Sequence, residues 1–242
     1  MAVRHLDWDG CFNVRDLGGL PAAGGRATRR GALVRGDALD RLSPEGWRAL
    51  EAHGVRTIVD LRTDGENRNG NAARPPRIAT VRVPLSRIED RAFRERWGDR
   101  PVFSTPLVYE PFLDRFAGSA AAAVAAIAHA EPGGVAFHCA GGRDRTGLIA
   151  GLVLTLVGVA PDDIVGDYAL SSPRMPARFA ALGLPDPAPA IAAFLRAEGT
   201  TAEAALLTFL DAVDVAARMR AAGLTDGDVA ALRDRALEPV AG

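Results

Sequence analysis

The stretch that decides the fold is His138-Cys139-Ala140-Gly141-Gly142-Arg143-Asp144-Arg145-Thr146-Gly147. The apolar run 134–137 before it predicts a strand, and the apolar run 148–159 after it predicts a helix. A glycine-containing loop between a strand and a helix start gathers backbone N–H groups at the positive end of the helix, where phosphate binds well. The same donors stabilise a thiolate, so we expect Cys139 to ionise readily.

The individual residues of this loop fit a phosphate site. Gly141 and Gly142 permit the backbone turns that such a loop needs. Arg145, six residues after Cys139, can bind two phosphate oxygens through its planar guanidinium, and Thr146 can offer its hydroxyl to the thiolate. The Cys-x5-Arg spacing alone is weak evidence, because all 29 basic residues of the chain are arginines. In its context, the loop predicts a nucleophilic phosphatase, with a phosphate-binding loop made of Ala140, Gly141, Gly142, Arg143 and Thr146.

This loop resembles the H-C-x5-R-[ST] signature of the cysteine-based protein tyrosine phosphatases. It is similar, more narrowly, to the H-C-x-x-G-K-D-R-T-G loop of the bacterial tyrosine/serine phosphatase family. Four further segments, in the expected order between about residues 12 and 171, resemble boxes of that family: Asn13-Val14-Arg15-Asp16-Leu17-Gly18-Gly19, Leu33-Val34-Arg35-Gly36-Asp37-Ala38-Leu39, Val55-Arg56-Thr57-Ile58-Val59-Asp60-Leu61-Arg62 with Glu66, and Asp167-Tyr168-Ala169-Leu170-Ser171. Two positions depart from the pattern, with Arg143 in place of lysine and Val14 in place of an aromatic residue.

The resemblance implies hydrolysis of phosphate monoesters through a phosphocysteine intermediate, with neither metal nor cofactor. The substrate would be a phosphorylated protein carrying phosphotyrosine, and phosphoserine or phosphothreonine are further candidates. A phosphoinositide or inositol phosphate is an alternative, because Arg143 can hold a second phosphate. Two weaker alternatives remain. A rhodanese-like sulfurtransferase would need no arginine six residues after the cysteine. A non-catalytic phosphate-binding module would usually have lost the cysteine or the arginine, whereas this chain has both Cys139 and Arg145.

The general acid that protonates the leaving oxygen is left open by the sequence. We favour Asp144, because it lies inside the loop and the resemblance implies that a loop aspartate can serve. Asp60, at the end of a predicted parallel strand, ranks second, and Asp99 in Trp97-Gly98-Asp99 ranks third. His138 is expected to orient the loop through a backbone contact, and Arg15 and Asp16 are expected to form a structural ion pair or turn near the pocket.

Predicted strands and helices alternate along the chain, which indicates an α/β fold with a central, mostly parallel sheet flanked by helices. The resemblance implies the protein tyrosine phosphatase-like version of this fold, and the last third of the chain adds extra helices. The expected strands are 31–34, 57–61, 80–84 and 135–137, and the expected helices are 43–53, 111–130, 148–159, 161–170, 201–217 and 225–237. We predict one phosphatase domain over 1–242. Its proline-rich segment 172–190 is interpreted as a loop, or as part of a lid over the site at about 172–200.

Composition narrows the class of protein. The 242 residues are 48% hydrophobic, enough to bury the core of one domain, and a formal charge of −1 argues against nucleic-acid binding. Cys11 and Cys139 are too few for a disulfide framework, and a reactive thiol needs a reducing compartment. The N-terminus lacks an apolar signal-peptide core, and the longest apolar run, 148–160, is too short to span a bilayer. We therefore expect a cytoplasmic protein without stable membrane insertion, and the oligomeric state stays open.

Overall fold

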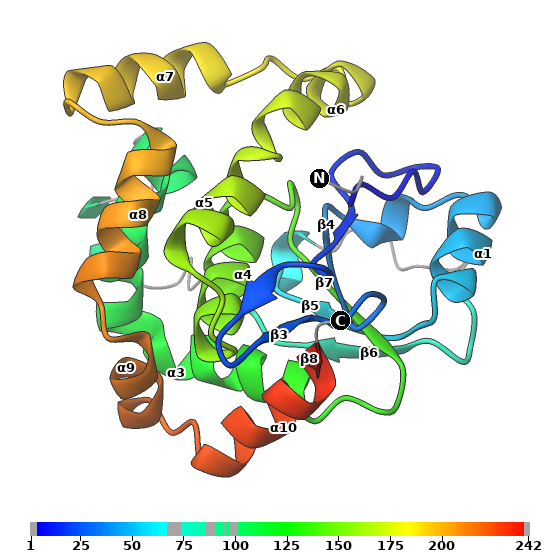
Figure 1. Cartoon of the computed structure of the whole chain (residues 1–242). Coiled ribbons are helices and arrows are strands. Elements are labelled where there is room, and N and C mark those ends of the chain that lie inside the picture. The colour runs from blue at the N-terminus through cyan, green and yellow to red at the C-terminus, as the bar shows by residue number, and fades with distance from the viewer. Residues whose placement is uncertain (1–3, 67–73, 86–90, 94, 97–100, 240–242) are drawn as a thin grey trace.

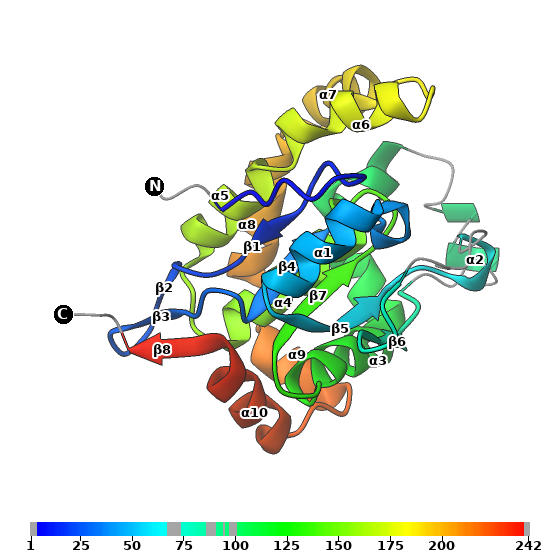
Figure 2. The same cartoon turned by 90° about the vertical axis from the view of Figure 1, so that its right-hand side faces the viewer.

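The computed structural model describes residues 4–66, 74–85, 91–93, 95–96 and 101–239. A five-stranded sheet forms the centre of the fold (Figures 1 and 2). Its strand order is β1 (Arg15–Asp16), β4 (Leu33–Gly36), β7 (Gly134–His138), β5 (Val55–Asp60) and β6 (Ala79–Arg82). Strands β4, β7, β5 and β6 are parallel, whereas the edge strand β1 runs antiparallel to β4. The predicted α/β fold with a mostly parallel sheet is confirmed.

The strand register brings three strand ends together at one edge of the sheet. Gly36 and Asp60 both pair with His138, each at the carboxyl end of its parallel strand. Ligands of open parallel sheets bind at this edge. Cys139 follows directly, so the fold places the cysteine where a ligand site is expected.

The sheet separates two apolar cores because successive strand residues point to opposite faces. On β7, Val135 and Phe137 belong to one core and Ala136 belongs to the other. Helix α1 (Pro44–Ala52) covers the smaller core, and it is capped by Ser43, whose side chain accepts a hydrogen bond from the Gly46 N–H. Helices α3 (Tyr109–Ala128), α4 (Asp144–Leu156) and α5 (Pro161–Ala169) lie over the opposite face (Figure 2).

Helix α4 begins four residues earlier than the apolar run suggested, because Asp144 already opens it at the end of the loop. The helix is apolar on nearly all sides, and α3, α5 and α9 (Val215–Ala221) pack around it. Its N-terminus is thereby fixed beneath the sheet edge that carries Cys139.

Among the residues that the structure describes, one segment, Pro106–Ala128, is long and apolar enough to cross a membrane by length and composition alone. It comprises the short turn η5 (Pro106–Val108) and helix α3. In this fold α3 packs against α4, α9 and α10 (Asp226–Ala236), so it serves as a core helix.

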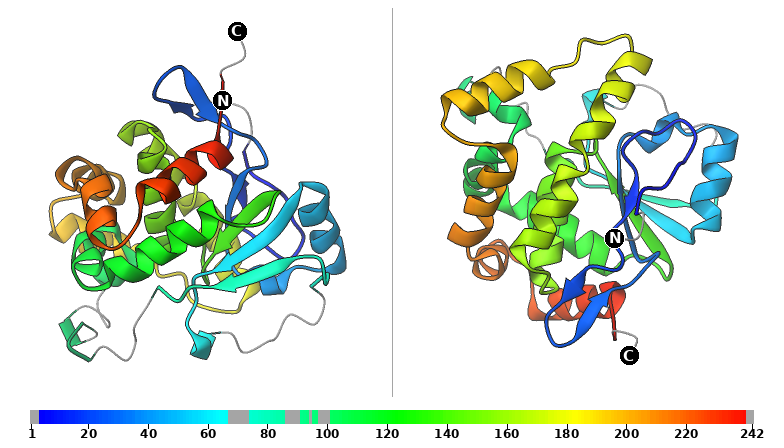
Figure 3. Two further views of the ribbon diagram at one scale, coloured as in Figure 1. Left: turned by 90° about the horizontal axis from the view of Figure 1, so that it is seen from below. Right: turned by 45° about the horizontal axis from the view of Figure 1, so that its top comes forward.

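The C-terminal part of the chain returns to the N-terminal hairpin. The capping box of Thr225 and Asp228 starts α10, which lies within the predicted helix 225–237. Beyond it, β8 (Leu237–Pro239) adds to β3 (Arg26–Thr28), which pairs with β2 (Pro21–Ala22) to give a second, three-stranded sheet. In the right-hand view of Figure 3 this hairpin (blue) and β8 (red) lie side by side at the bottom of the molecule.

Two sequence predictions about helices are corrected. The expected helix 201–217 is two helices, α8 (Ala202–Ala212) and α9, because the Asp214 side chain accepts from the Ala217 N–H and caps a new helix. The segment 172–190 is largely helical, containing the turn η6 (Ser172–Arg174), α6 (Met175–Ala181) and the start of α7 (Ala188–Ala197) (Figure 1). The remaining short elements are η1 (Leu39–Arg41), η2 (Asp64–Glu66), α2 (Arg91–Phe93) and η4 (Pro101–Ser104).

Candidate active site

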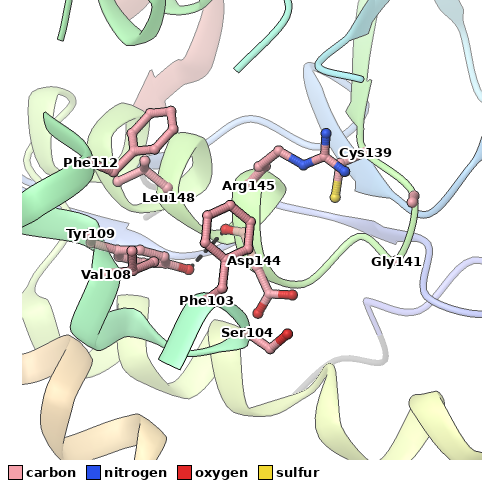
Figure 4. A pocket seen from close by; sticks show the side chains of 11 residues that line it. Phe103, Ser104, Val108, Tyr109, Phe112, Cys139, Gly141, Asp144, Arg145 and Leu148 are labelled. Carbon is pink, nitrogen blue, oxygen red and sulfur yellow. Dashed lines mark hydrogen bonds between the residues drawn. The ribbon is translucent and has the colours of Figure 1, made fainter. Parts of the chain in front are cut away.

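The phosphate loop, defined as residues 139–143, connects β7 to α4 and borders a pocket of about 230 Å³ (Figure 4). The polar end of the pocket is formed by Cys139, Ala140, Gly141, Asp144 and Arg145. The remaining lining residues come mainly from η4, η5 and α3, and all but Ser104 are apolar or aromatic: Phe103, Ser104, Val108, Tyr109, Phe112 and Leu148. The site therefore joins a thiol and a cation to a wall that can pack against an aromatic ring.

Cys139 is 3% exposed and lies at the end of the central strand. Figure 4 shows its thiol on the same side of the pocket as the guanidinium of Arg145. Burial alone would lower the pKa of Arg145, but the hydrogen bonds to Glu66 and the electrostatic interaction with Cys139 raise it above its ordinary value. Arg145 therefore stays cationic beside the sulfur.

Glu66 fixes the direction of the Arg145 guanidinium. Its two carboxylate oxygens each accept from one terminal nitrogen of Arg145 at 2.6 Å. Thr63 holds the same carboxylate through its N–H at 3.0 Å and its hydroxyl at 2.9 Å. Although burial opposes it, these partners lower the pKa of Glu66 to about 2. Because a guanidinium has five N–H donors, the pair leaves donors of Arg145 available for phosphate.

Asp144 is the candidate acid that the structure brings into the pocket with Cys139. Its side chain is 32% exposed, and Figure 4 shows the carboxylate near Ser104. The Tyr109 hydroxyl donates to the Asp144 carbonyl oxygen at 2.9 Å and ties α3 to the start of α4. Asp144 thus combines a fixed backbone with a carboxylate that water and substrate can reach.

Arg143 does not line the pocket. Its Nε donates to Asp144 Oδ1 at 3.1 Å and its Nη2 to the Ser104 carbonyl at 3.3 Å. Burial by itself lowers the pKa of Arg143, but the Asp144 charge raises it above its usual range. In this conformation, Arg143 orients the Asp144 carboxylate instead of presenting a free cation for a second phosphate.

Asp60, the second candidate acid, lies outside this pocket. Its carboxylate is held by Arg62 at 2.9 Å from both Nε and Nη2. It borders a second pocket, of about 260 Å³, on the other side of His138. Asp99 lies outside the described residues.

Arg15 and Asp16 are not paired with each other, and of the two predicted arrangements the turn is the one that forms. Arg15 donates to Asp167 Oδ1 at 3.0 Å, while Asp16 Oδ2 contacts His53 at 2.9 Å. Successive residues of the short strand β1 point to opposite faces, so the two side chains cannot meet. Asp16 also accepts from the Gly18 and Gly31 N–H groups, which makes it part of a turn as expected.

His138, which precedes the loop, and Thr146, in the first turn of α4, differ in whether they form the contacts that the sequence predicts. His138 is 2% exposed and its Nδ1 contacts the Cys139 carbonyl at 3.1 Å, the backbone contact that was predicted. Burial lowers the pKa of His138, so its ring is neutral near pH 7. Thr146 Oγ1 is buried without a hydrogen-bond partner among the described residues, so the expected bond to Cys139 is not formed here.

Sequence reasoning did not identify the aromatic wall or the role of Glu66. The wall residues Phe103 of η4 and Tyr109 and Phe112 of α3 lie upstream of the loop and carry no motif of their own. Glu66 stood in the D-L-R-x-x-x-E pattern, and that spacing was the available signal for a carboxylate near Arg145.

A buried cysteine at a strand end, an adjacent arginine and a helix start define a cysteine-based phosphate site on a protein tyrosine phosphatase-like α/β fold. The chain belongs to the tyrosine phosphatase family, whose model matches residues 6–238. This membership sets aside the sulfurtransferase alternative.

Three curated proteins are similar to the chain. One from Cupriavidus necator, provisionally named a tyrosine-protein phosphatase, is 35% identical over 178 residues, or 71% of this chain and 64% of its own length. The tyrosine-protein phosphatase of Nostoc commune is 35% identical over 154 residues, covering 63% of this chain and 52% of that protein. The triple specificity protein phosphatase PtpB of Mycobacterium tuberculosis is 29% identical over 205 residues, covering 73% of this chain and 71% of that protein. The chain thus matches between half and two thirds of the length of the first two relatives.

Proposed function

We propose that the chain is a cysteine-dependent phosphatase that hydrolyses phosphotyrosine in proteins. One observation carries the proposal: Cys139, Arg145 and Asp144 line a single pocket together with Phe103, Tyr109 and Phe112. Family membership supports the same reaction class.

In the first step, the Cys139 thiolate attacks phosphorus opposite the leaving oxygen. The S–P bond forms as the P–O bond breaks, and Asp144 donates its proton to the leaving phenolate oxygen. Arg145 and the loop N–H groups bind the equatorial oxygens, over which the transition-state charge is spread.

In the second step, water attacks the phosphocysteine. The S–P bond breaks, the thiolate leaves, and the Asp144 carboxylate takes the proton of the attacking water. Inorganic phosphate is released and both side chains return to their starting protonation states.

The aromatic wall supports an aryl phosphate as substrate. A tyrosine ring can pack edge-to-face or offset against Phe103, Tyr109 and Phe112, whereas a serine side chain is too short to reach them from the phosphate site. The engagement of Arg143 with Asp144 and Ser104 favours phosphotyrosine over a phosphoinositide, because the cation that would bind a second phosphate already has these two partners.

We also propose that the protein works in the reducing environment of the cytoplasm, because the free thiol of Cys139 would be oxidised in an oxidising compartment.

The decisive experiment compares the wild type with Cys139→Ser on p-nitrophenyl phosphate, phosphotyrosine, phosphoserine and phosphoinositides, with and without EDTA. We expect turnover that survives EDTA, is fastest on the aryl phosphates and is abolished in Cys139→Ser, since a protonated hydroxyl is a poor nucleophile. Turnover retained in Cys139→Ser contradicts the mechanism, and a wild type that binds phosphate without turnover identifies a non-catalytic phosphate-binding module.

A further inference from the structure

Three consecutive carbonyl groups of the phosphate loop are bound from outside by side chains of three distant segments. The Ala140 carbonyl accepts from Arg178 Nη2 of α6 at 2.8 Å. The Gly141 carbonyl accepts from Asn13 Nδ2 at 3.1 Å, and the Gly142 carbonyl accepts from Arg35 Nη2 of β4 at 2.9 Å.

These contacts fix the direction of the loop N–H groups. In a planar trans peptide the carbonyl of one residue points opposite to the N–H of the next, and no cis peptide bond occurs among the described residues. Holding the carbonyls of residues 140–142 on one side therefore turns the N–H groups of Gly141, Gly142 and Arg143 to the other side. A loop that binds an anion needs this arrangement, and glycines alone leave it free to turn over.

Two buried carboxylates contact the three anchoring residues, through the backbone of Asn13 and the side chains of Arg178 and Arg35. Asp37 accepts from the Asn13 N–H at 3.0 Å, and its Oδ2 lies 3.7 Å from Arg178 Nε. Asp167 accepts from Arg35 Nη1 at 2.7 Å and from Arg15 Nε at 3.0 Å.

Arg15 in turn orients the Asn13 amide. Its Nη1 donates to Asn13 Oδ1 at 2.9 Å, and because a guanidinium can only donate, the amide nitrogen of Asn13 must face the Gly141 carbonyl. The direction of that bond is thus set by the network itself.

The burial of this network favours a positioning role over a stabilising one. Asn13, Arg15, Arg35, Asp37 and Asp167 are each at most 1% exposed. Buried ion pairs recover their desolvation cost only in part, and apolar residues of similar size often stabilise a fold better. Such a network instead orients the groups that it binds, here the loop carbonyls.

We propose that Asn13, Arg35 and Arg178 are positioning residues, which hold the phosphate loop in its anion-binding conformation through the carbonyls of Ala140, Gly141 and Gly142. Asp37 and Asp167 support them. The proposal rests on the proposed phosphatase function, and it assigns a task to the sequence boxes around Asn13, Arg35 and Asp167 and to helix α6. Docking of α6 is thereby coupled to the loop through one arginine.

The test uses Arg178→Met, which removes the side-chain donor and leaves the Ala140 carbonyl only the Ala38 N–H at 3.3 Å, and Arg178→Lys, which keeps a cation with a single donor nitrogen. Asn13→Ser shortens a second anchor without a change in charge. Arg174→Met is the matched control, because Arg174 lies on the same segment but donates at 2.7 Å to the Phe12 carbonyl, outside the loop. Each variant of the full chain is measured for the dissociation constant of inorganic phosphate by calorimetry, for kcat and KM on p-nitrophenyl phosphate, and for Tm.

We expect Arg178→Met and Asn13→Ser to weaken phosphate binding and to lower kcat by about three- to tenfold each, the effect of one lost hydrogen bond. Arg178→Lys should recover part of both losses, and Arg174→Met should match the wild type. Unchanged phosphate affinity and kcat in both anchor variants overturn the proposal, and so does a loss in the Arg174→Met control of the same size.

The two proposals fail in different ways. If the wild type has no turnover, the phosphatase function fails, while phosphate calorimetry still tests the anchors. If turnover follows Cys139 but the anchor variants bind phosphate normally, only the positioning role is wrong. A variant whose Tm shows that it is unfolded is replaced in the comparison by the other anchor variant, since Arg178 and Asn13 lie on separate segments.

Discussion

At the scale of single residues, the placement of Asp144 determines how the leaving oxygen receives its proton. It is the candidate carboxylate that lines the pocket with Cys139, whereas Asp60 is occupied by Arg62. Arg143 Nε at 3.1 Å from Oδ1 holds the Asp144 carboxylate in a defined direction. A general acid contributes typically about 10²–10⁴-fold, and its contribution grows with the basicity of the leaving group.

Asp144→Asn should therefore cost most with phenyl phosphate and least with p-nitrophenyl phosphate, because p-nitrophenolate leaves without protonation. The variant should also flatten the basic limb of the pH–rate profile, since that limb reports loss of the proton from the acid. Single-substrate kinetics over a series of substituted phenyl phosphates measure both effects. Asp60→Asn and Asp99→Asn are the comparison, and a leaving-group dependence that appears in one of them and not in Asp144→Asn assigns the acid differently.

A second prediction concerns Glu66, which binds both terminal nitrogens of Arg145. Glu66→Gln keeps the shape but can accept through only one oxygen, so the guanidinium loses its fixed plane. We expect kcat on p-nitrophenyl phosphate to fall by about 10- to 100-fold, in the range of a lost charge-assisted hydrogen bond. Glu51→Gln is the matched control, because Glu51 pairs with Arg77 on the surface and away from the pocket.

The pH dependence of the Glu66–Arg145 pair follows from the lowered pKa of Glu66. Since its folded-state pKa of about 2 lies below the ordinary value of 4.5, its contribution is complete above pH 4.5 and is lost as the pH falls toward 2. Phosphate binding in the wild type should therefore show no step from Glu66 at neutral pH. A step near pH 6 that disappears in Glu66→Gln contradicts the bidentate pair.

At the scale of elements, the two glycines of the loop have different roles. Gly142 has a φ of +68°, and a Cβ on it would lie 2.6 Å from the Gly36 carbonyl carbon and 2.7 Å from the Asp37 nitrogen. A Cβ on Gly141 would meet nothing within 4 Å, and its φ is not in the left-handed region. Only Gly142 is required by the close approach of the loop to β4.

Gly142→Ala should destabilise the fold by about 2 kcal/mol or more, from the left-handed backbone and the backbone contact together. For a chain of this length that lowers Tm by roughly 4–8 °C. Gly141→Ala should change the free energy of unfolding by no more than about 0.5 kcal/mol and therefore change Tm little. Thermal unfolding of the two variants side by side is the measurement, and equal Tm values would mean that the loop does not approach β4 in solution.

The elements show what a single sequence can predict. The central strands and helices α1, α4 and α10 follow from apolar periodicity and from the caps at Ser43 and Thr225. Helices α6 and α7 were not predicted, because Pro176 and Pro189 were interpreted as loop markers although both lie in the first turn of a helix, where proline is tolerated.

Some residues of the site can likewise be predicted from the sequence, and others cannot. Cys139, Asp144 and Arg145 lie in one local motif, and local motifs can be interpreted from sequence. Glu66 is 79 positions from Arg145, and Arg178 is 38 positions from Ala140. Such partners depend on how the sheet and helices pack, so their roles emerge only from the structure.

At the scale of the whole molecule, Asp167 of α5 joins segments that are far apart in the chain. It binds Arg4 at 2.9 Å and Arg15 at 3.0 Å from the N-terminal segment, and Arg35 at 2.7 Å from β4. Burial by itself raises the pKa of Asp167, but these three arginines lower it well below its ordinary value. One carboxylate thus fixes the N-terminal segment, the sheet and the helical layer relative to each other, and through Arg35 it reaches the phosphate loop.

Asp167→Asn should be among the most destabilising single changes outside the apolar core, because it leaves three arginines facing a neutral amide. Removing one partner from a buried ion pair costs about 3–5 kcal/mol, which corresponds to a Tm lower by roughly 6–20 °C for this chain length. Asp114→Asn, which breaks the exposed pair with Arg218, is the control and should change Tm little.

Because the folded-state pKa of Asp167 is lowered, the contribution of Asp167 to stability is complete above the ordinary pKa of 3.8 and is lost as the pH falls below that value. Urea unfolding at pH 7 and at pH 3 measures both effects. The difference in free energy of unfolding between wild type and Asp167→Asn should be smaller at pH 3 than at pH 7. A larger difference at pH 3 would show that the arginines do not hold Asp167 as the carboxylate.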